Sequence, residues 1–451
     1  MIEIVCPNNN IPERTYAINA LLSDVLGCKQ EDYNIRYEED SAYVISFVGD
    51  GKKIIIEDHF FNRYPEPISY LKKESMPETL RYFHGLGMEV PIIYGEDKFV
   101  YNDDSIVSGL DIFASTFFML TRWEESLLGR EEKGDCDESQ LFCVKHGIHH
   151  RSIVNEYAEL LRKLLPSHLL CATHNYKVVL SHDVDGFLTP TWMTIGKDFV
   201  RQTIKGAPKN RTVHLTWKDE IRYKKAFPRA WSQFDIYTKS AEKFDIEEWF
   251  YFKVCAKGET EATYGYDSQE AKSIVGKLKS KHNPKVVLGF HPSQNTFGNR
   301  DQWSKEVERI KGLLNDTPII GRNHHLFYNY ETLRLWESIT ETPLHISNCV
   351  FHKRLGFRSG VCVPYRLFDL YQRRVMNLIE HPCQIMDTVI RYDEKVKSEN
   401  ERWLDIQSTI DFVNQYQGEL VLTWHIYIRN RKLIQDYFKW CEKVIQYAVK
   451  G

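Results

Sequence analysis

The stretch KVVLSHDVDG, residues 177–186, places two aspartates directly after an apolar run. Residues 178–180 have the pattern of a buried strand, and Asp183 and Asp185 stand two positions apart at its end. A carboxylate is costly to bury unless a cation, a metal or hydrogen bonds compensate its charge. Because side chains at i and i+2 of an extended chain point to the same side, both carboxylates are expected to face one pocket.

Short apolar runs alternate with helix-like segments from this point to the end of the chain. Seven runs have the strand pattern: KVVLS (177–181), EEWFYFKVC (247–255), KVVLGF (285–290), TPIIG (317–321), PLHIS (343–347), QIMDT (384–388) and ELVLTWH (419–425). Segments 268–282 and 304–316 read as helices between them. Such alternation predicts a parallel sheet with crossover helices, and its length favours a closed or nearly closed β/α barrel. An open doubly wound sheet is the alternative, although no G-x-G-x-x-G follows the first strand.

The N-terminal region has a different, mixed α/β pattern. Two strands are expected at 42–48 and 52–61 around a turn at 49–51, and two helices at 108–127 and 152–166. We therefore expect a domain boundary near residue 175. It divides the chain into a region of unknown role, 1–175, and the barrel, 176–451.

Composition narrows the class of protein. The 451 residues carry a net charge of -3, with 42% hydrophobic and 27% charged residues, so nucleic acid is not the expected partner. The most apolar segment, 111–120, is too short to span a bilayer, and no secretory signal is recognised at the N-terminus. The ten cysteines include no C-x-x-C. We expect reduced thiols in a cytoplasmic protein.

Ionisable residues gather where the predicted strands end. They are His182, Asp183 and Asp185 after the first run, His291 after the third, Arg322, His324 and His325 after the fourth, Asp387 at the sixth and His425 at the seventh. In a β/α barrel the active site is built at this end of the strands. A metal held by one aspartate and a water deprotonated by the other would make a metal-assisted hydrolase. His182 points opposite to the aspartates and is expected to be structural.

Several of these segments together resemble a known family. The segments VVLSHDVDGF, LGFHPSQNT, GRNHHLF, LGFRSGVCVPY and LVLTWH occur in the order found in polysaccharide deacetylases, the NodB-homology group of carbohydrate esterases. DIFASTFFMLTRWEE and IVNEYAELL are similar to the extra N-terminal region of one branch. The resemblance implies a distorted (β/α)7-8 barrel that removes an N-acetyl or O-acetyl group from a sugar, with zinc as the expected metal.

The resemblance also implies roles for individual residues. They are Asp183 as general base, Asp185 and His291 as metal ligands, Arg322 as the group that orients the base, His425 as general acid and Asp387 as the carboxylate that orients His425. The chemistry agrees, because amide hydrolysis needs an activated water and an acid for the leaving amine. Trp424, next to His425, is expected to stack on a sugar ring, and Arg358 to bind a negatively charged sugar or phosphate.

Two positions depart from the family pattern. Asn295 stands where the family has the second histidine of its His-x-x-x-His metal pair. Three alternatives remain: His324 or His325 supplies the third ligand, Asn295 itself does, or no functional metal binds. Ile346 stands where an aspartate is expected, which would change the substrate pocket.

The resulting hypothesis is a zinc-dependent deacetylase acting on an acetylated sugar or glycan precursor in surface polysaccharide or glycoconjugate synthesis. The alternatives are a catalytically inactive glycan-binding relative and another C–N amidohydrolase on the same barrel. The sequence does not determine the sugar or the oligomeric state.

Overall fold

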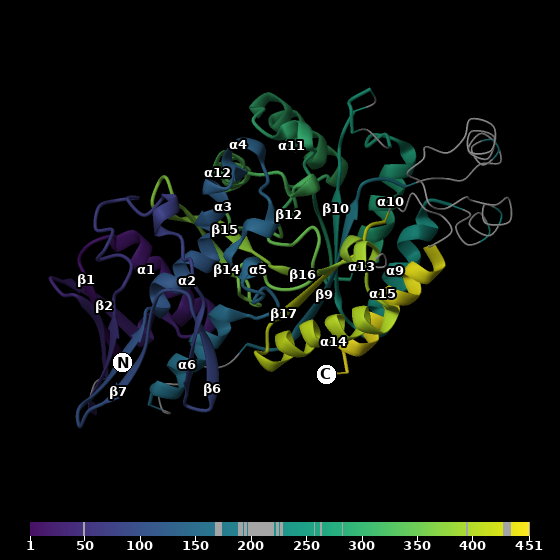
Figure 1. The fold of residues 1–451 in the computed structure, drawn as a ribbon. Helices are drawn as coiled ribbons and strands as arrows, with labels where there is room; N and C mark the ends of the chain where they lie inside the picture. Colours follow the sequence, from purple (N-terminus) through teal and green to yellow (C-terminus); the bar gives the residue numbers. More distant parts are fainter. Residues whose placement is uncertain are drawn as a thin grey trace. The chain divides into compact units, whose positions relative to one another are not determined.

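The computed structural model describes residues 1–47, 50–166, 174–187, 229–256, 258–261, 264–281, 283–393, 396–426 and 434–450, together with 193, 196, 221 and 225 (Figure 1). The chain forms two compact units. Unit 1 consists of Met1–Lys177, Leu326–Ile385 and Ser408–Leu420, and unit 2 of Val178–His325, Met386–Gln407 and Val421–Gly451. The first break falls two residues after the expected boundary, but later segments return to unit 1, so the units are not two successive stretches of chain.

The N-terminal part of unit 1 is built on a six-stranded sheet in the order β2-β1-β3-β4-β8-β7. Its strands are β1 (Ile2–Pro7), β2 (Tyr33–Glu38), β3 (Ala42–Phe47), β4 (Asp50–Glu57), β7 (Gly95–Tyr101) and β8 (Ser105–Leu110), with a separate hairpin of β5 (Arg81–Gly85) and β6 (Met88–Ile92). β3 and β4 pair antiparallel, as the pattern of residues 42–61 predicts. Residues 48 and 49 of the expected turn lie outside the described part of the chain.

The helices of unit 1 correct one prediction. They are α1 (Ile11–Asn19), α2 (Ile112–Thr121), α3 (Trp123–Leu127), α4 (Arg130–Lys133), α5 (Phe142–Lys145), α6 (Ile153–Leu164) and α12 (Tyr330–Glu337). The prediction of a single helix over 108–127 is wrong. Residues 108–110 belong to β8, and the rest forms two helices, α2 and α3. The Asp111 carboxylate accepts a hydrogen bond from the Ala114 backbone N–H, which starts α2 only after β8 has ended. Arg122 adopts a left-handed backbone at φ 49°, which separates α2 from α3.

Unit 1 also contains strands from the second half of the chain. They are β13 (Leu344–Ile346), β14 (Tyr365–Asp369) and β15 (Arg374–Glu380), in the order β14-β15-β13. β16 (Cys383–Met386) ends at the boundary between the units. The apolar-run pattern missed β14 and β15, which pair antiparallel across a short turn.

Unit 2 contains the alternating strands and helices. Its elements are β9 (Lys177–Val184), α9 (Trp231–Phe244), β10 (Glu247–Phe252), α10 (Gln269–Ser280), β11 (Val286–Phe290), α11 (Arg300–Leu314), β12 (Ile320–Gly321), α13 (Asp387–Asp393), α14 (Glu399–Gln415), β17 (Glu419–Thr423) and α15 (Ile434–Ala448). Of these, β9, α14 and β17 cross the unit boundary. The strand order is β12-β11-β10-β9-β17, and β9 to β12 pair parallel.

Every predicted apolar run contains a strand, and the chain is a mixed α/β protein. The described part of unit 2 has an open row of strands. None of the helices described here is both long and apolar enough to cross a membrane.

The cysteines differ from expectation at one position. Among the described residues, Cys6, Cys136, Cys143, Cys255, Cys349, Cys362, Cys383 and Cys441 carry buried free thiols. Cys28, in contrast, is disulfide-bonded. The expectation that all thiols are reduced is therefore wrong at Cys28.

Candidate metal-dependent active site

Parallel pairing brings the carboxyl ends of four strands of unit 2 to one edge. Tyr251 of β10 lies opposite Asp183 of β9, and Phe290 of β11 lies opposite Gly321 of β12. The backbone hydrogen bonds continue past the strand ends, from the His291 N–H to the Phe252 carbonyl and from the Arg322 N–H to the Phe290 carbonyl. The polar residues that follow these strands are therefore held side by side by backbone geometry.

Gly289 allows β11 and β12 to approach this closely. A Cβ atom at this position would stand 2.3 Å from the Ile320 carbonyl oxygen, a distance that no side chain can adopt. Glycine is thus required at this position, two residues before His291, so that β11 and β12 can pair where they carry the site residues.

Asp185, His291 and His324 form a cluster with the composition of a metal site. Oδ1 of Asp185 lies 3.4 Å from Nε2 of His291 and 3.2 Å from Nε2 of His324. The three ligand atoms all lie within 4.8 Å of one another. Two imidazole nitrogens and one carboxylate oxygen are a donor set typical of catalytic zinc, which keeps a further position open for water or substrate.

The hydrogen bonding of His291 fits this role. Its Nδ1 lies 2.6 Å from the Arg322 carbonyl oxygen, and a carbonyl only accepts, so Nδ1 carries the proton. In the neutral imidazole, Nε2 then presents a lone pair. This buried atom makes no regular hydrogen bond within the described part of the chain, although Asp185 is close. A bound cation would give this buried nitrogen the partner that it otherwise lacks.

Of His324, His325 and Asn295, the structure brings His324 together with Asp185 and His291. Burial lowers the pKa of His324, which favours the neutral imidazole that a metal requires. His325 is exposed on a left-handed backbone with φ 54°. Asn295 is half-buried on the short helical turn Gln294–Thr296, and none of the described polar contacts joins it to the cluster.

Asp183 and Arg322 form a buried ion pair beside the cluster. Nη1 of Arg322 lies 2.9 Å from Oδ1 of Asp183, and Nη1 and Nη2 each lie 3.3 Å from the Ser181 hydroxyl. Oδ2 of Asp183 is directed to the other side, 3.8 Å from Nε2 of His425 and 4.0 Å from Nε2 of His291. Burial alone raises the pKa of Asp183, but Arg322 and the two histidines outweigh it and lower that pKa.

His425 is held by Asp387 through two hydrogen bonds. The Nδ1 atom lies 2.8 Å from Oδ1, and the backbone N–H donates to Oδ2 at 2.9 Å. Burial on its own lowers the pKa of His425. The charges of Asp387, Asp183 and Asp185 and the hydrogen bond that the ring donates to Asp387 raise it to about 9. The imidazole is consequently protonated at neutral pH, with Nε2–H directed toward Asp183.

Sequence reasoning missed two residues of this site. Nζ of Lys253 lies 3.9 Å from Oδ1 of Asp185, and the side chain is 3% exposed. Oε2 of Glu261 lies 2.9 Å from Nδ1 of His324. Burial raises the pKa of Glu261, but the contact with His324 outweighs it and lowers that pKa to about 2. Lys253 follows β10, so the rule of polar residues at strand ends would have found it, whereas no sequence pattern marks Glu261.

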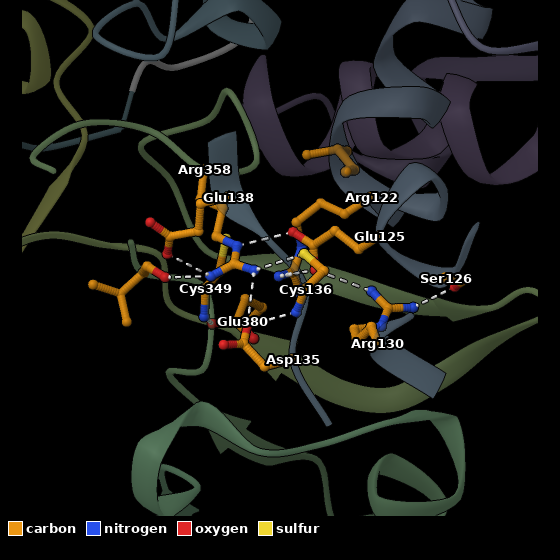
Figure 2. A network of polar contacts seen from close by, with 12 residues as sticks. Arg122, Glu125, Ser126, Arg130, Asp135, Cys136, Glu138, Cys349, Arg358 and Glu380 are labelled. Atoms are coloured by element: carbon orange, nitrogen blue, oxygen red, sulfur yellow. Dashed lines mark hydrogen bonds and ion pairs between the residues drawn. The ribbon is translucent and has the colours of Figure 1, made fainter. Parts of the chain in front are cut away.

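Two predicted substrate-binding residues are not available for that role. Trp424 is fully buried and packs against Tyr437, with ring centroids 6.0 Å apart, so it presents no face to a sugar. Arg358 belongs to unit 1 and is buried between Glu125, at 2.8 Å, and Glu138, at 3.3 Å (Figure 2). Its charge is already compensated by these carboxylates, which leaves none for an anionic ligand.

Two other residues have structural roles. His182 points away from the aspartates, as expected: Nδ1 lies 2.7 Å from the Trp424 carbonyl oxygen and Nε2 lies 3.2 Å from the buried Glu248 carboxylate. Ile346, at the position where an aspartate was expected, is wholly buried in β13 of unit 1.

Comparison with known proteins gives a family match within unit 1 and similar solved structures. The model of a family of unknown function, DUF7033, matches residues 2–169, and no curated protein matches. One similar solved structure, from Bordetella bronchiseptica, is described as a "putative polysaccharide deacetylase involved in o-antigen biosynthesis"; it has 13% identity and a TM-score of 0.30, over 60% of this chain and 89% of that chain. Another, from Mycobacterium smegmatis, is described as a "putative polysaccharide deacetylase", with 11% identity and a TM-score of 0.33, over 60% and 85%. At these scores, functional inference rests on the side chains of the site.

Proposed function

We propose that the protein is a metal-dependent hydrolase that removes an acetyl group from an acetylated sugar, in the synthesis of a surface polysaccharide or glycoconjugate, on a distorted β/α barrel. One observation carries the proposal. A carboxylate and two imidazoles with the donor set of a zinc site lie beside an Arg-paired aspartate and an Asp-paired histidine, all within unit 2. The motif order in the sequence, which resembles polysaccharide deacetylases, supports the substrate class.

Each side chain has one task in the proposed reaction. Asp185, His291 and His324 would hold the metal, which when bound supplies a Lewis acid for the acetyl carbonyl and its attacking water. Asp183 takes a proton from that water at Oδ2, because Arg322 occupies Oδ1. Arg322 also keeps the carboxylate ionised.

His425 then gives its Nε2 proton to the departing sugar amine or alkoxide. Asp387 prepares this step by holding Nδ1, so that the ring carries both protons and its Nε2–H stays directed toward the reacting groups. The separation of 3.8 Å between Asp183 Oδ2 and His425 Nε2 supports this division of tasks, because both groups can reach one reacting centre in turn.

Metal content of the purified chain is the first test. The protein is incubated with zinc, desalted and measured by elemental analysis, beside His291→Ala and, as a control, His84→Ala, whose imidazole is 66% exposed. We expect close to one zinc per chain in the wild type and in the control, and loss of zinc in His291→Ala. Absence of bound metal after incubation with excess zinc, cobalt or nickel would overturn the hydrolase proposal and favour a glycan-binding relative.

Acetate release from a panel of N- and O-acetylated saccharides is the second test. Asp183→Asn should retain zinc and lose acetate release, because the amide cannot take the proton. Cleavage of non-acetyl amides in place of acetylated sugars would assign a different amidohydrolase.

A further inference from the structure

We infer that Glu261 is the positioning residue for the third metal ligand, holding His324 so that this histidine replaces the one that the chain lacks at Asn295. The inference rests on the proposed metal site. It concerns a residue that neither composition nor motif order marks.

The two ring nitrogens of His324 face two different carboxylates. Nδ1 lies 2.9 Å from Oε2 of Glu261, and Nε2 lies 3.2 Å from Oδ1 of Asp185. The ring is therefore fixed in rotation as well as in position. Glu261 is 12% exposed and His324 11%, so little water competes for the contact.

This arrangement selects one tautomer. A neutral imidazole has a single N–H, and both carboxylates only accept hydrogen bonds. The contact of Nδ1 with Glu261, at 2.9 Å, is shorter than that of Nε2 with Asp185, at 3.2 Å, and therefore favours the proton on Nδ1 and a lone pair on Nε2. His291 reaches the same state through the Arg322 carbonyl at 2.6 Å. Both imidazoles thus present Nε2 to Asp185, each oriented by an acceptor on its far side, the arrangement that orients metal-ligating histidines and raises their basicity.

Glu261 also fixes the loop that carries Asn295. Its Oε2 accepts the backbone N–H of Gln294 at 3.0 Å. The His324 N–H donates to the Pro292 carbonyl at 3.0 Å. The Glu261 carboxylate therefore joins the segment after β11 to the segment after β12. The first segment carries Asn295, where the family has its histidine, and the second carries His324, the proposed third metal ligand.

Zinc affinity of Glu261→Ala tests the inference, with Glu259→Ala as the matched control. Glu259 lies in the same short segment but pairs with Arg309, at 2.9 Å, and does not contact His324 among the described interactions. We expect zinc affinity, measured by competition with a chromogenic chelator, to fall about 10- to 100-fold in Glu261→Ala. It should stay within about twofold of wild type in Glu259→Ala. Glu261→Gln, whose amide oxygen still accepts from Nδ1, should recover most of the affinity.

The ligand set gives a readout that does not depend on activity. X-ray absorption of the zinc-loaded wild type should show two imidazole ligands on the zinc, and the spectrum of His324→Ala should show one. Asn295→Ala should leave both the spectrum and the zinc affinity unchanged. Unchanged affinity in Glu261→Ala, an equal loss in Glu259→Ala, or loss of zinc in Asn295→Ala would overturn the inference. If one of these results were found but His291→Ala still abolished zinc binding, the proposed function would stand and only the inference about Glu261 would fall. A wild-type chain that binds no metal would overturn both.

If Glu261→Ala does not fold, as judged by circular dichroism of the metal-free protein, Glu261→Met, which keeps the volume and removes the acceptor, and the double variant Glu261→Met/His324→Ala replace it. Glu261 acting through His324 predicts that the double variant binds zinc no more weakly than His324→Ala alone. Additive losses would overturn the inference.

Discussion

Nδ1 of His425 lies 2.8 Å from Oδ1 of Asp387, and the backbone N–H of His425 lies 2.9 Å from Oδ2 of the same carboxylate. The residues are 38 positions apart in the sequence, yet one carboxylate fixes both the main chain and the ring of the other. The acid of the proposed reaction is therefore oriented before substrate binds, and among the carboxylates that raise its pKa, Asp387 is the one that it hydrogen-bonds.

Replacing Asp387 should change the titration of His425. In the metal-free protein we expect NMR to place the pKa of His425 at about 9, and Asp387→Asn to lower it to the usual value near 6.5 or below, because burial then acts with less opposition. Asp405→Asn, which removes a carboxylate paired with Lys397 at the surface, is the control. The same pKa in wild type and Asp387→Asn would contradict the prediction.

The same pair predicts how stability depends on pH. The folded-state pKa of His425 lies above its unfolded value of 6.5, so its charged form stabilises the fold fully below that pH. The contribution is lost as pH rises through about 9. The free energy of unfolding should therefore fall more between pH 6.5 and 9 in wild type than in Asp387→Asn, as measured by urea unfolding at each pH.

Removing Arg322 should destabilise the fold. Arg322→Met leaves Asp183 buried without its guanidinium, and breaking a buried pair in this way costs about 3–5 kcal/mol. Ser181→Ala, which removes only the hydroxyl that Arg322 also contacts, should cost about 1 kcal/mol. Asp183→Asn combined with Arg322→Met should cost less than the sum of the single changes, because no unpaired charge remains. An additive result in urea unfolding would show that the pair is not coupled.

Lys253 should oppose metal binding. Its ammonium lies 3.9 Å from the Asp185 oxygen that would hold the metal, and two unit charges about 4 Å apart interact by about 4 kcal/mol at an effective dielectric constant of 20. Lys253→Met keeps the volume and removes the charge, so zinc affinity should rise about tenfold or more. Lys285→Met, at a surface pair with Asp245, is the control. Unchanged or weaker binding in Lys253→Met would show that the ammonium does not repel the metal.

The buried arginine network of unit 1 should be a stability element (Figure 2). Arg358→Met leaves Glu125 and Glu138 short of a donor in a buried environment, at a cost of about 3–5 kcal/mol. Arg162→Met, which removes an exposed i,i+3 pair with Glu159, should change the free energy of unfolding by less than about 1 kcal/mol. Equal effects of the two substitutions in urea unfolding would contradict the assignment.

The sequence allowed much of unit 2 to be predicted. Strand runs are visible because buried parallel strands are continuously apolar, and the ionisable residues that follow them stand out against that pattern. Asp183 and Asp185 at the end of β9, His291 after β11, and Arg322 and His324 after β12 were all recognised in this way. The two antiparallel strands β14 and β15 were missed because charged and polar residues interrupt their apolar residues, so neither forms a continuous apolar run.

By itself, the sequence determined which strand ends carry carboxylates, imidazoles and a guanidinium, because apolar periodicity and residue type are local properties. Only the tertiary structure decided which of them meet. His324 lies beside Asp185, because β12 is paired next to β11 and a glutamate 63 positions away holds the imidazole. Trp424 and Arg358 were misjudged for the same reason: exposure and charge compensation depend on residues distant in sequence, which only folding brings into contact.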